Sequence, residues 1–352
     1  MLRLLVVDDS ALMRRHLRQI FEAEGDFRVE LARNGVEALQ KVRDFEPDVV
    51  TLDVNMPEMD GLSCLEQMMA VRPTSVVMVS SLTEAGAEVT MKALELGAVD
   101  FVCKPDGTVS LHFNRVRPAL VEKVRTAARV KPRRAKGLQQ RLARQRTARP
   151  ASAARGPSLG LAPSGLVLVG VSTGGPRTLE EILPKFTETF PWPVLVAQHM
   201  PQSFTGVFAR RMDAICPLEV VEVERSMPIQ RGRIYIGRGD ADLVVERRFG
   251  RIVASSVPAD ASLWHPSVDR LVATAMDILP ASALVGVQLT GMGSDGATAM
   301  TELHRRGGRT VAESEATAVV FGMPHELIQR GGASLVRPCE AIAGTVIEWI
   351  TS

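Results

Sequence analysis

Short continuous apolar runs alternate with segments of helical periodicity along most of this chain, and this alternation restricts the possible fold more than any other feature. Five such runs occur in residues 1–105, namely LRLLVVDD, FRVELARNG, DVVTLDVNMP, SVVMVSS and AVDFVCKP. Between them, apolar residues recur about every 3.6 positions, as on one face of a helix. Runs of Val and Leu are typical of parallel strands that helices cover on both faces. The first part of the chain is therefore predicted to be an α/β domain with a doubly wound parallel sheet.

The remainder of the chain follows the same alternation less evenly. Four long runs, GLVLVGVS, PVLVAQHM, ALVGVQLT and RTVAES, are interpreted as buried parallel strands separated by helices. Shorter strands are predicted between the second and third of these, at LEVVEVE, RGRIYIG, DLVVERRFG and RIVASS. The last two predict a hairpin that turns at Phe249 and Gly250. We therefore expect a second doubly wound α/β domain with an antiparallel hairpin.

A strongly basic segment separates the two alternating regions. Between Lys123 and Arg155 there are 12 Lys or Arg residues and no Asp or Glu, although the whole chain carries a net charge of only +2. The segment lacks sustained apolar periodicity and ends in Pro, Ala, Ser and Gly, as linkers do. At 352 residues the chain is long enough for two domains. We predict a first domain over residues 1–120, a flexible basic linker over 121–162 and a second domain over 163–352.

Composition restricts the compartment. Hydrophobic residues make up 45% and charged residues 23% of the chain, as in soluble globular proteins. The four cysteines lie far apart without a C-x-x-C pair, so neither a disulfide framework nor a zinc site is expected. The N-terminus MLRLLVVDDS does not continue as a signal peptide, and no run reaches the roughly 18 apolar residues of a membrane span. A cytoplasmic protein is predicted, with membrane association only through a partner.

Polar residues end four of the five runs in the first domain. Asp8 and Asp9 follow the first run, Asp53 the third, Ser80 the fourth and Lys104 the fifth. In an open parallel sheet the carboxyl ends of the strands meet at one edge, where ligands bind. Three carboxylates together repel one another without a cation, and their oxygens suit Mg²⁺. A metal ion there would allow Asp53 to attack a phosphoryl donor, with Lys104 balancing the developing charge.

These residues resemble the receiver domain of two-component response regulators over about residues 1–120. The resemblance implies a flavodoxin-like sheet in which Asp53 accepts a phosphoryl group from a histidine kinase. It also implies a Mg²⁺ site formed by Asp8, Asp9 and Asp53.

The same resemblance implies three further roles at this edge. Ser80 and Lys104 would contact the phosphoryl oxygens, and Phe101 stands where the family has its aromatic switch residue. Ser81 competes with Ser80 for the hydroxyl role, because the two serines are adjacent.

Three loops of the second domain carry the residue types of a nucleophile, a base and an orienting acid. Ser172, His199 and Asp295 directly follow apolar runs in GLVLVGVSTGG, PVLVAQHMP and ALVGVQLTGMGSDG. This pattern predicts a hydrolase that needs no cofactor in this half of the chain. The segment around Ser172 matches G-x-S-x-G, the nucleophile turn of α/β-hydrolases. Chain order argues against that fold, because there the acid precedes the histidine.

A dinucleotide site is a rival interpretation of the third loop. Gly291, Gly293 and Gly296 spell G-x-G-x-x-G after a predicted strand and before a predicted helix, and Glu313 stands about 20 residues further on. However, Asp295 would place a negative charge inside the pyrophosphate site. The motif also lies late in the domain instead of at its first strand, so the hydrolase interpretation is preferred.

The segments GVSTGGP, QHMPQSFT, HPSVD and LTGMGSDGA closely resemble the catalytic domain of the chemotaxis protein-glutamate methylesterases, the CheB family, over residues 163–350. The resemblance implies a triad that hydrolyses glutamyl methyl esters on the cytoplasmic helices of chemoreceptors, with glutamine deamidation as a second activity. It further implies an oxyanion donor in the amide of Met292, with Thr173 beside the nucleophile. Trp264, His265 and Pro266 are expected to line the substrate cleft, although the family often has Arg before this segment.

The two resemblances together predict a hydrolase regulated by phosphorylation for adaptation in chemotaxis. The receiver domain would cover the catalytic cleft until Asp53 is phosphorylated. An esterase or peptidase with another substrate is the nearest alternative. A DNA-binding regulator would use the basic linker, but the linker lacks interleaved aromatic residues and no helix-turn-helix is evident, so no nucleic-acid partner is expected.

Overall fold

The computed structural model describes residues 1–80, 83–104, 109–130, 163–260 and 262–351. The chain divides into two compact units, Met1–Leu142 and Ala143–Ser352. In the described ranges, no helix is both long enough and apolar enough to cross a membrane.

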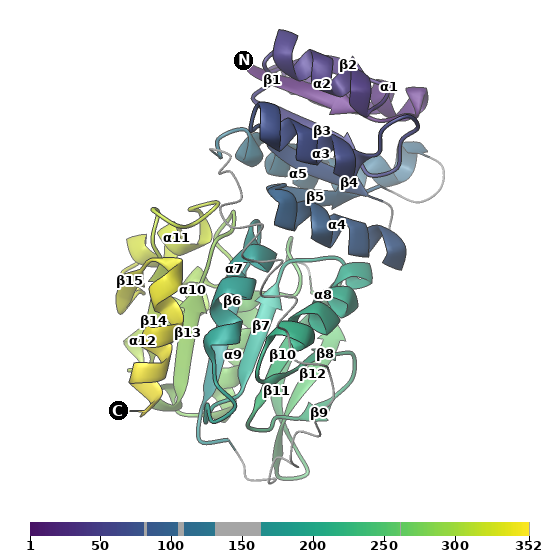
Figure 1. Ribbon diagram of the computed structural model, residues 1–352. Helices are drawn as coiled ribbons and strands as arrows, with labels where there is room; N and C mark the ends of the chain where they lie inside the picture. The colour runs from purple at the N-terminus through teal and green to yellow at the C-terminus, as the bar shows by residue number, and fades with distance from the viewer. Residues whose placement is uncertain (81–82, 105–108, 131–162, 261, 352) are drawn as a thin grey trace. The chain divides into compact units, whose positions relative to one another are not determined.

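The first unit is a five-stranded sheet in which every pair of neighbouring strands is parallel, with the order β2-β1-β3-β4-β5. Its strands alternate with helices along the chain, as the apolar runs predicted (Figure 1). Every residue of β3 and β4 is buried, which explains why these two strands consist of continuous apolar runs. The elements are β1 Leu2–Val7, α1 Ala11–Glu22, β2 Phe27–Ala32, α2 Gly35–Asp44, β3 Val49–Asp53, α3 Gly61–Val71, β4 Ser75–Ser80, α4 Glu84–Leu96, β5 Asp100–Cys103 and α5 Val109–Ala127.

Helix α5 extends seven residues beyond position 120, where the sequence predicted the end of the first domain. Leu120, Val121 and Val124 of this helix are buried, so this part of the predicted linker belongs to the packed unit. Two cations of the basic segment are also paired within it. Lys123 Nζ lies 3.0 Å from Asp100 Oδ1, and Arg125 bonds Asp26. Residues 131–162 of the predicted linker lie outside the described residues.

The second unit contains a seven-stranded sheet with the order β15-β14-β13-β6-β7-β10-β8, in which every pair is parallel. The central strand β6 comes first in the chain, and the strands on its two sides follow in two groups. The elements of this sheet and its helices are β6 Leu166–Val171, α7 Gly175–Ile182, β7 Val194–Gln198, α8 Gln202–Ile215, β8 Glu219–Val223, β10 Arg233–Gly237, α9 Val268–Ile278, β13 Leu284–Gln288, α10 Ala297–Arg305, β14 Arg309–Glu313, α11 Met323–Gln329, β15 Leu335–Arg337 and α12 Cys339–Thr351.

A separate antiparallel sheet has the order β11-β12-β9, from Ala241–Arg248, Arg251–Pro258 and Met227–Pro228. Its hairpin turns at Phe249 and Gly250, whose φ angles are 48° and 75°. The predicted hairpin is therefore confirmed. The shorter strands β8 and β10, which the sequence grouped with it, instead extend the parallel sheet beyond β7.

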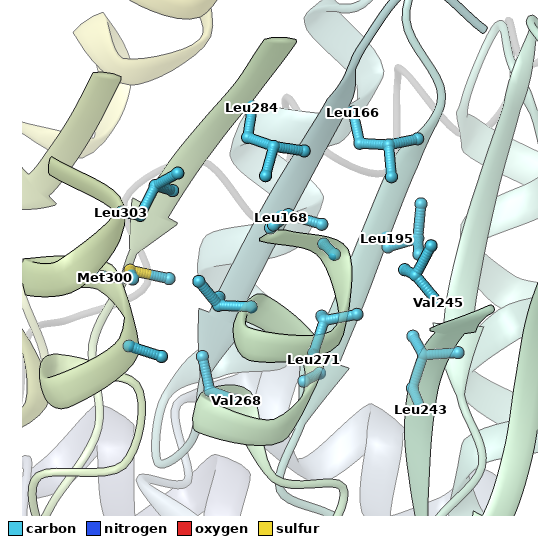
Figure 2. Close-up of a cluster of buried hydrophobic side chains, with 14 of the residues drawn as sticks. Leu166, Leu168, Leu195, Leu243, Val245, Val268, Leu271, Leu284, Met300 and Leu303 are labelled. Atoms are coloured by element: carbon cyan, nitrogen blue, oxygen red, sulfur yellow. The ribbon is translucent and has the colours of Figure 1, made fainter. Parts of the chain in front are cut away.

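A large hydrophobic cluster of the second unit lies where α9 packs between the parallel sheet and β11, with α10 packed against α9, β13 and β14 (Figure 2). Leucines of β6 and β7 meet the apolar face of α9 there, and all of these side chains are buried. This packing fixes the start of α9 against the ends of the central strands. The labelled side chains are Leu166, Leu168, Leu195, Leu243, Val245, Val268, Leu271, Leu284, Met300 and Leu303.

Candidate active site and receiver edge

Ser172, His199 and Asp295 come together at the carboxyl ends of three neighbouring strands. Ser172 directly follows β6, His199 directly follows β7, and Asp295 lies in the loop after β13. Backbone hydrogen bonds join the loops: the amide of Ser172 donates to Thr290 O at 2.9 Å, and that of His199 to Val171 O at 3.0 Å. Strands β13 and β7 flank β6 although they lie far apart in the chain, so this is a topological switch point of the sheet. Ligands bind at such points in open α/β sheets.

His199 is held by Asp295 on one side of its ring. His199 Nε2 lies 2.8 Å from Asp295 Oδ2. The other ring nitrogen, Nδ1, is buried and has no hydrogen-bond partner among the residues that the structure describes. With a proton on Nε2 donated to the carboxylate, Nδ1 keeps its lone pair and is the nitrogen available to act as a base.

Asp295 is fixed at the start of helix α9. Its carboxylate accepts hydrogen bonds from the amides of Val268 at 2.7 Å and Asp269 at 3.0 Å, and from the hydroxyl of Ser267 at 3.1 Å. Burial raises the pKa of Asp295, but the hydrogen bonds from His199 and the two amides outweigh it, so the net pKa is lowered. The carboxylate is therefore ionised and oriented, as an acid that holds a histidine must be.

The turn that contains Met292 packs directly on the nucleophile. A Cβ on Gly291 would lie only 2.7 Å from Ser172 Cβ, so glycine allows the two backbones to approach. Thr290 ties this turn to the loop after β6, because its hydroxyl donates to Thr173 O at 2.9 Å. Met292 and Thr173 are both buried beside Ser172's loop.

His265 is held by hydrogen bonds at both ring nitrogens. Nδ1 lies 2.8 Å from Asp242 Oδ1 and Nε2 lies 3.0 Å from Ser262 O. Asp242 is buried, so this pair lies away from solvent at the start of β11. The ring therefore links the segment before α9 to β11. Its place in the substrate cleft stays a prediction.

Two glutamines near the triad were missed from the sequence, whereas Trp264 belongs to the segment that was expected to line the substrate cleft. Trp264 stacks on the imidazole of His199, with ring centroids 5.9 Å apart and 10° between the planes. Gln198 Nε2 donates to Ser172 O, and Gln288 Nε2 donates to Asp295 O. The two glutamines end apolar strands, which is the same signal that identified the acids of the first domain.

The dinucleotide interpretation is wrong for this site. Glu313, the residue expected on a ribose, is fully buried and accepts hydrogen bonds from Thr290 N and Thr317 Oγ1. Asp295 is already occupied by His199 and by the amides of α9. Neither carboxylate is free to bind a nucleotide.

In the first unit, Asp8, Asp53 and Lys104 meet at the carboxyl edge of the sheet. Lys104 Nζ lies 2.9 Å from Asp8 Oδ2 and 2.7 Å from Asp53 Oδ2. Burial raises the pKa of Asp53, and the charge of Asp8 adds to the rise, although Lys104 opposes it. Burial lowers the pKa of Lys104, but the two carboxylates outweigh it and the net pKa is raised.

The same edge fits a divalent cation. Asp8, Asp9 and Asp53 each offer a carboxylate oxygen, and these oxygens lie within 4.8 Å of one another. One lysine cannot balance three carboxylates, and carboxylate oxygens are the ligands that Mg²⁺ prefers. The donor set therefore suits the metal that the sequence predicted.

Ser80 and Phe101 lie on β4 and β5 beside this edge. Ser80 is buried at the carboxyl end of β4, and its hydroxyl donates to Gly86 O at 3.3 Å. Phe101 is also buried, and Lys123 Nζ lies 5.3 Å from the centroid of its ring. Ser81, the alternative to Ser80, lies outside the described residues.

Comparisons with known proteins find a similar family for each of the two parts of the chain. The sequence model of the CheB methylesterase family matches residues 167–346, and that of the response regulator receiver domain matches residues 4–113. A Rhodospirillum rubrum protein named protein-glutamate methylesterase/protein-glutamine glutaminase 3 is 56% identical, covering 100% of this chain and 97% of the relative. A Rhodopseudomonas palustris protein named protein-glutamate methylesterase/protein-glutamine glutaminase 2 is 52% identical, covering 99% and 98%. The crystal structure of the Thermotoga maritima CheB methylesterase catalytic domain is 37% identical, with a TM-score of 0.50, and covers 52% of this chain and 97% of that domain.

Proposed function

This chain belongs to the CheB methylesterase family, and we propose that Ser172, His199 and Asp295 form the triad with which it hydrolyses glutamyl methyl esters on chemoreceptor helices. One observation carries the assignment of roles. His199 is bound to Asp295 through Nε2, while the buried Nδ1 has no partner in the described part of the chain. An oriented base with one free nitrogen, on the strand next to the serine loop, is what a serine hydrolase requires.

In the proposed reaction, Ser172 Oγ attacks the ester carbonyl while His199 Nδ1 takes the hydroxyl proton. Asp295 stabilises the imidazolium, and the Met292 amide, beside Thr173, is the proposed donor to the oxyanion. The bond to the methoxy oxygen then breaks, and His199 returns the proton so that methanol leaves. Water repeats these steps on the acyl-enzyme and releases Ser172 and the glutamate. An amide substrate would release ammonia instead.

Methanol release from a methylated receptor tests this function. The full chain should release methanol from the cytoplasmic fragment of a methylated chemoreceptor, and Ser172→Ala should abolish the release. Asp295→Asn should lower kcat by about 10³- to 10⁴-fold, because an amide in place of the carboxylate favours the wrong tautomer of His199. Circular dichroism of each variant establishes that it is folded.

A substrate comparison separates the methylesterase from other hydrolases. Receptor fragments and small carboxylic esters should be assayed side by side with the same protein. Rapid hydrolysis of small esters or peptides, with no methanol from the receptor, would favour an esterase or peptidase with another substrate. Ammonia release from receptor glutamines in the same assay would identify deamidation.

We further propose that phosphorylation of Asp53 by a histidine kinase controls this activity. Asp8, Asp9 and Asp53 would hold Mg²⁺, which neutralises charge around phosphoryl oxygens when it is bound. Lys104, already bonded to Asp53, and Ser80 at the end of β4 are the groups proposed to receive the phosphoryl oxygens. Phe101 is proposed to report this change to the surface of the first unit.

A further inference from the structure

Trp264 lies face to face with the triad histidine, and the proposed function gives it no role. Its indole and the imidazole of His199 are nearly parallel, at 10°, with centroids 5.9 Å apart. The indole also lies close to the oxyanion turn, because a Cβ on Gly293 would be 3.8 Å from Trp264 Nε1. Trp264 is only half-buried, so burial in a core does not account for its position.

The backbone around Trp264 is fixed on the side that leads into helix α9. Its neighbour His265 donates to Asp242, and the carbonyl of His265 accepts from Met200 N at 3.3 Å. Ser267 N donates to the same aspartate at 2.7 Å, and the hydroxyl of Ser267 donates to the carboxylate of the triad. Asp242 is buried, and although burial raises its pKa, the hydrogen bonds from His265, Ser267 and an arginine lower it overall. The indole is therefore held over His199 by a network of charged hydrogen bonds.

An aromatic face at this place affects the charge that the reaction creates. When His199 takes the serine proton its ring becomes a cation, and Asp295 neutralises this cation only at the edge that carries Nε2. The face of an indole is negative and attracts a cation within about 6 Å of its centroid, tryptophan being the most effective ring for this interaction.

We propose that Trp264 is a positioning residue of the methylesterase reaction, which fixes the plane of His199 and stabilises its protonated form. This inference rests on the proposed function, since it takes His199 as the general base. Other titratable groups near the pair are Asp295 on the ring edge, Asp269 at the start of α9, and His265, next to Trp264 in the chain, with its partner Asp242. None of these is removed when Trp264 is replaced.

The test is the pH profile of kcat/KM for Trp264→Leu and Trp264→Phe, measured with methylated receptor fragment. Trp264→Leu should lower kcat about tenfold with little change in KM. It should also move the acid limb of the profile to lower pH, because His199 without the indole holds its proton less tightly. Trp264→Phe retains an aromatic face, so it should keep most of the native kcat and most of the native position of the acid limb. A residue that only supported the loop would lower the rate at every pH and leave the acid limb in place.

The matched control is Trp349→Leu, the same change on helix α12 in a half-buried tryptophan far along the chain. It should leave the acid limb unmoved. NMR titration of the His199 ring in the inactive Ser172→Ala background provides a second measurement that needs no turnover. Its midpoint should fall when Trp264→Leu is added, and an unchanged midpoint together with an unmoved limb overturns the proposal. If the midpoint shifts but the native chain releases no methanol from the receptor fragment, the result would contradict the proposed function and leave the effect of Trp264 on His199 standing.

Discussion

Glu313 of the second unit is an acid with no exposed surface. Its carboxylate accepts hydrogen bonds from Thr290 N at 2.9 Å and Thr317 Oγ1 at 3.0 Å. Burial raises the pKa of Glu313 to about 7, and the charges of Glu181 and Glu340 add to the rise. Because the amide of Thr290 is bound to this carboxyl and the carbonyl of Thr290 to the nucleophile's amide, Glu313 supports the site through one intervening residue.

The raised pKa of Glu313 predicts a stability that decreases with pH. The folded state keeps the proton up to a pH of about 7, whereas the unfolded state loses it near the ordinary value of 4.5. Stability is therefore fully present below pH 4.5 and declines as pH rises to about 7, by ~3 kcal/mol in total. Glu313→Gln cannot ionise, so urea unfolding should show it similar to the native chain at pH 5 and more stable at pH 8. Glu315→Gln, at an exposed position, is the matched control. A difference between Glu313→Gln and the native chain that is equal at both pH values would contradict the prediction.

Among the elements, the turn after β13 depends on one glycine for its fit to the nucleophile. A Cβ on Gly291 would lie 2.4 Å from Met323 Sδ and 2.7 Å from Ser172 Cβ. Gly291→Ala should therefore displace Ser172, and a displacement of about 1 Å costs on the order of 10² in kcat. Gly344→Ala on helix α12, where no atom lies within 4 Å, should leave kcat unchanged. Methanol release by both variants measures this, and unaltered kcat in Gly291→Ala would show that the turn moves freely.

Local sequence patterns predicted the helices and strands better than they predicted which strands lie next to each other in a sheet. Polar residues at the ends of apolar runs led to the prediction of Asp53, Ser172 and His199 as site residues. The apolar run and the polar residue that ends it lie within a few positions of each other, so a local pattern includes both. The direction of β8 and β10 was not predictable in this way. Parallel neighbours usually need a helical crossover, whereas here the chain between them passes through β9 in the other sheet. The stacking of Trp264 on His199 depends on the separate packing of β7 and α9, which no local pattern records.

At the scale of the whole molecule, the two units are joined by the segment between helix α5 and strand β6. Helix α5 ends at Ala127 and strand β6 begins at Leu166. The second unit is similar to the Thermotoga maritima catalytic domain, for which there is a crystal structure. Control of Ser172 by Asp53 must therefore be tested by comparing the whole chain with this part.

Phosphorylation is expected to increase the activity of the full chain only. With Mg²⁺ and a small phosphodonor, methanol release by residues 1–352 should rise about tenfold, which corresponds to ~1.4 kcal/mol of shifted equilibrium. Asp53→Asn should keep the unstimulated rate and lose the response, and removal of Mg²⁺ by a chelator should have the same effect on the native chain. Residues 163–352 should be insensitive to the phosphodonor and more active than the unphosphorylated chain, because the proposed inhibition by the first unit is removed. Equal rates in all of these preparations would show that the two units work independently.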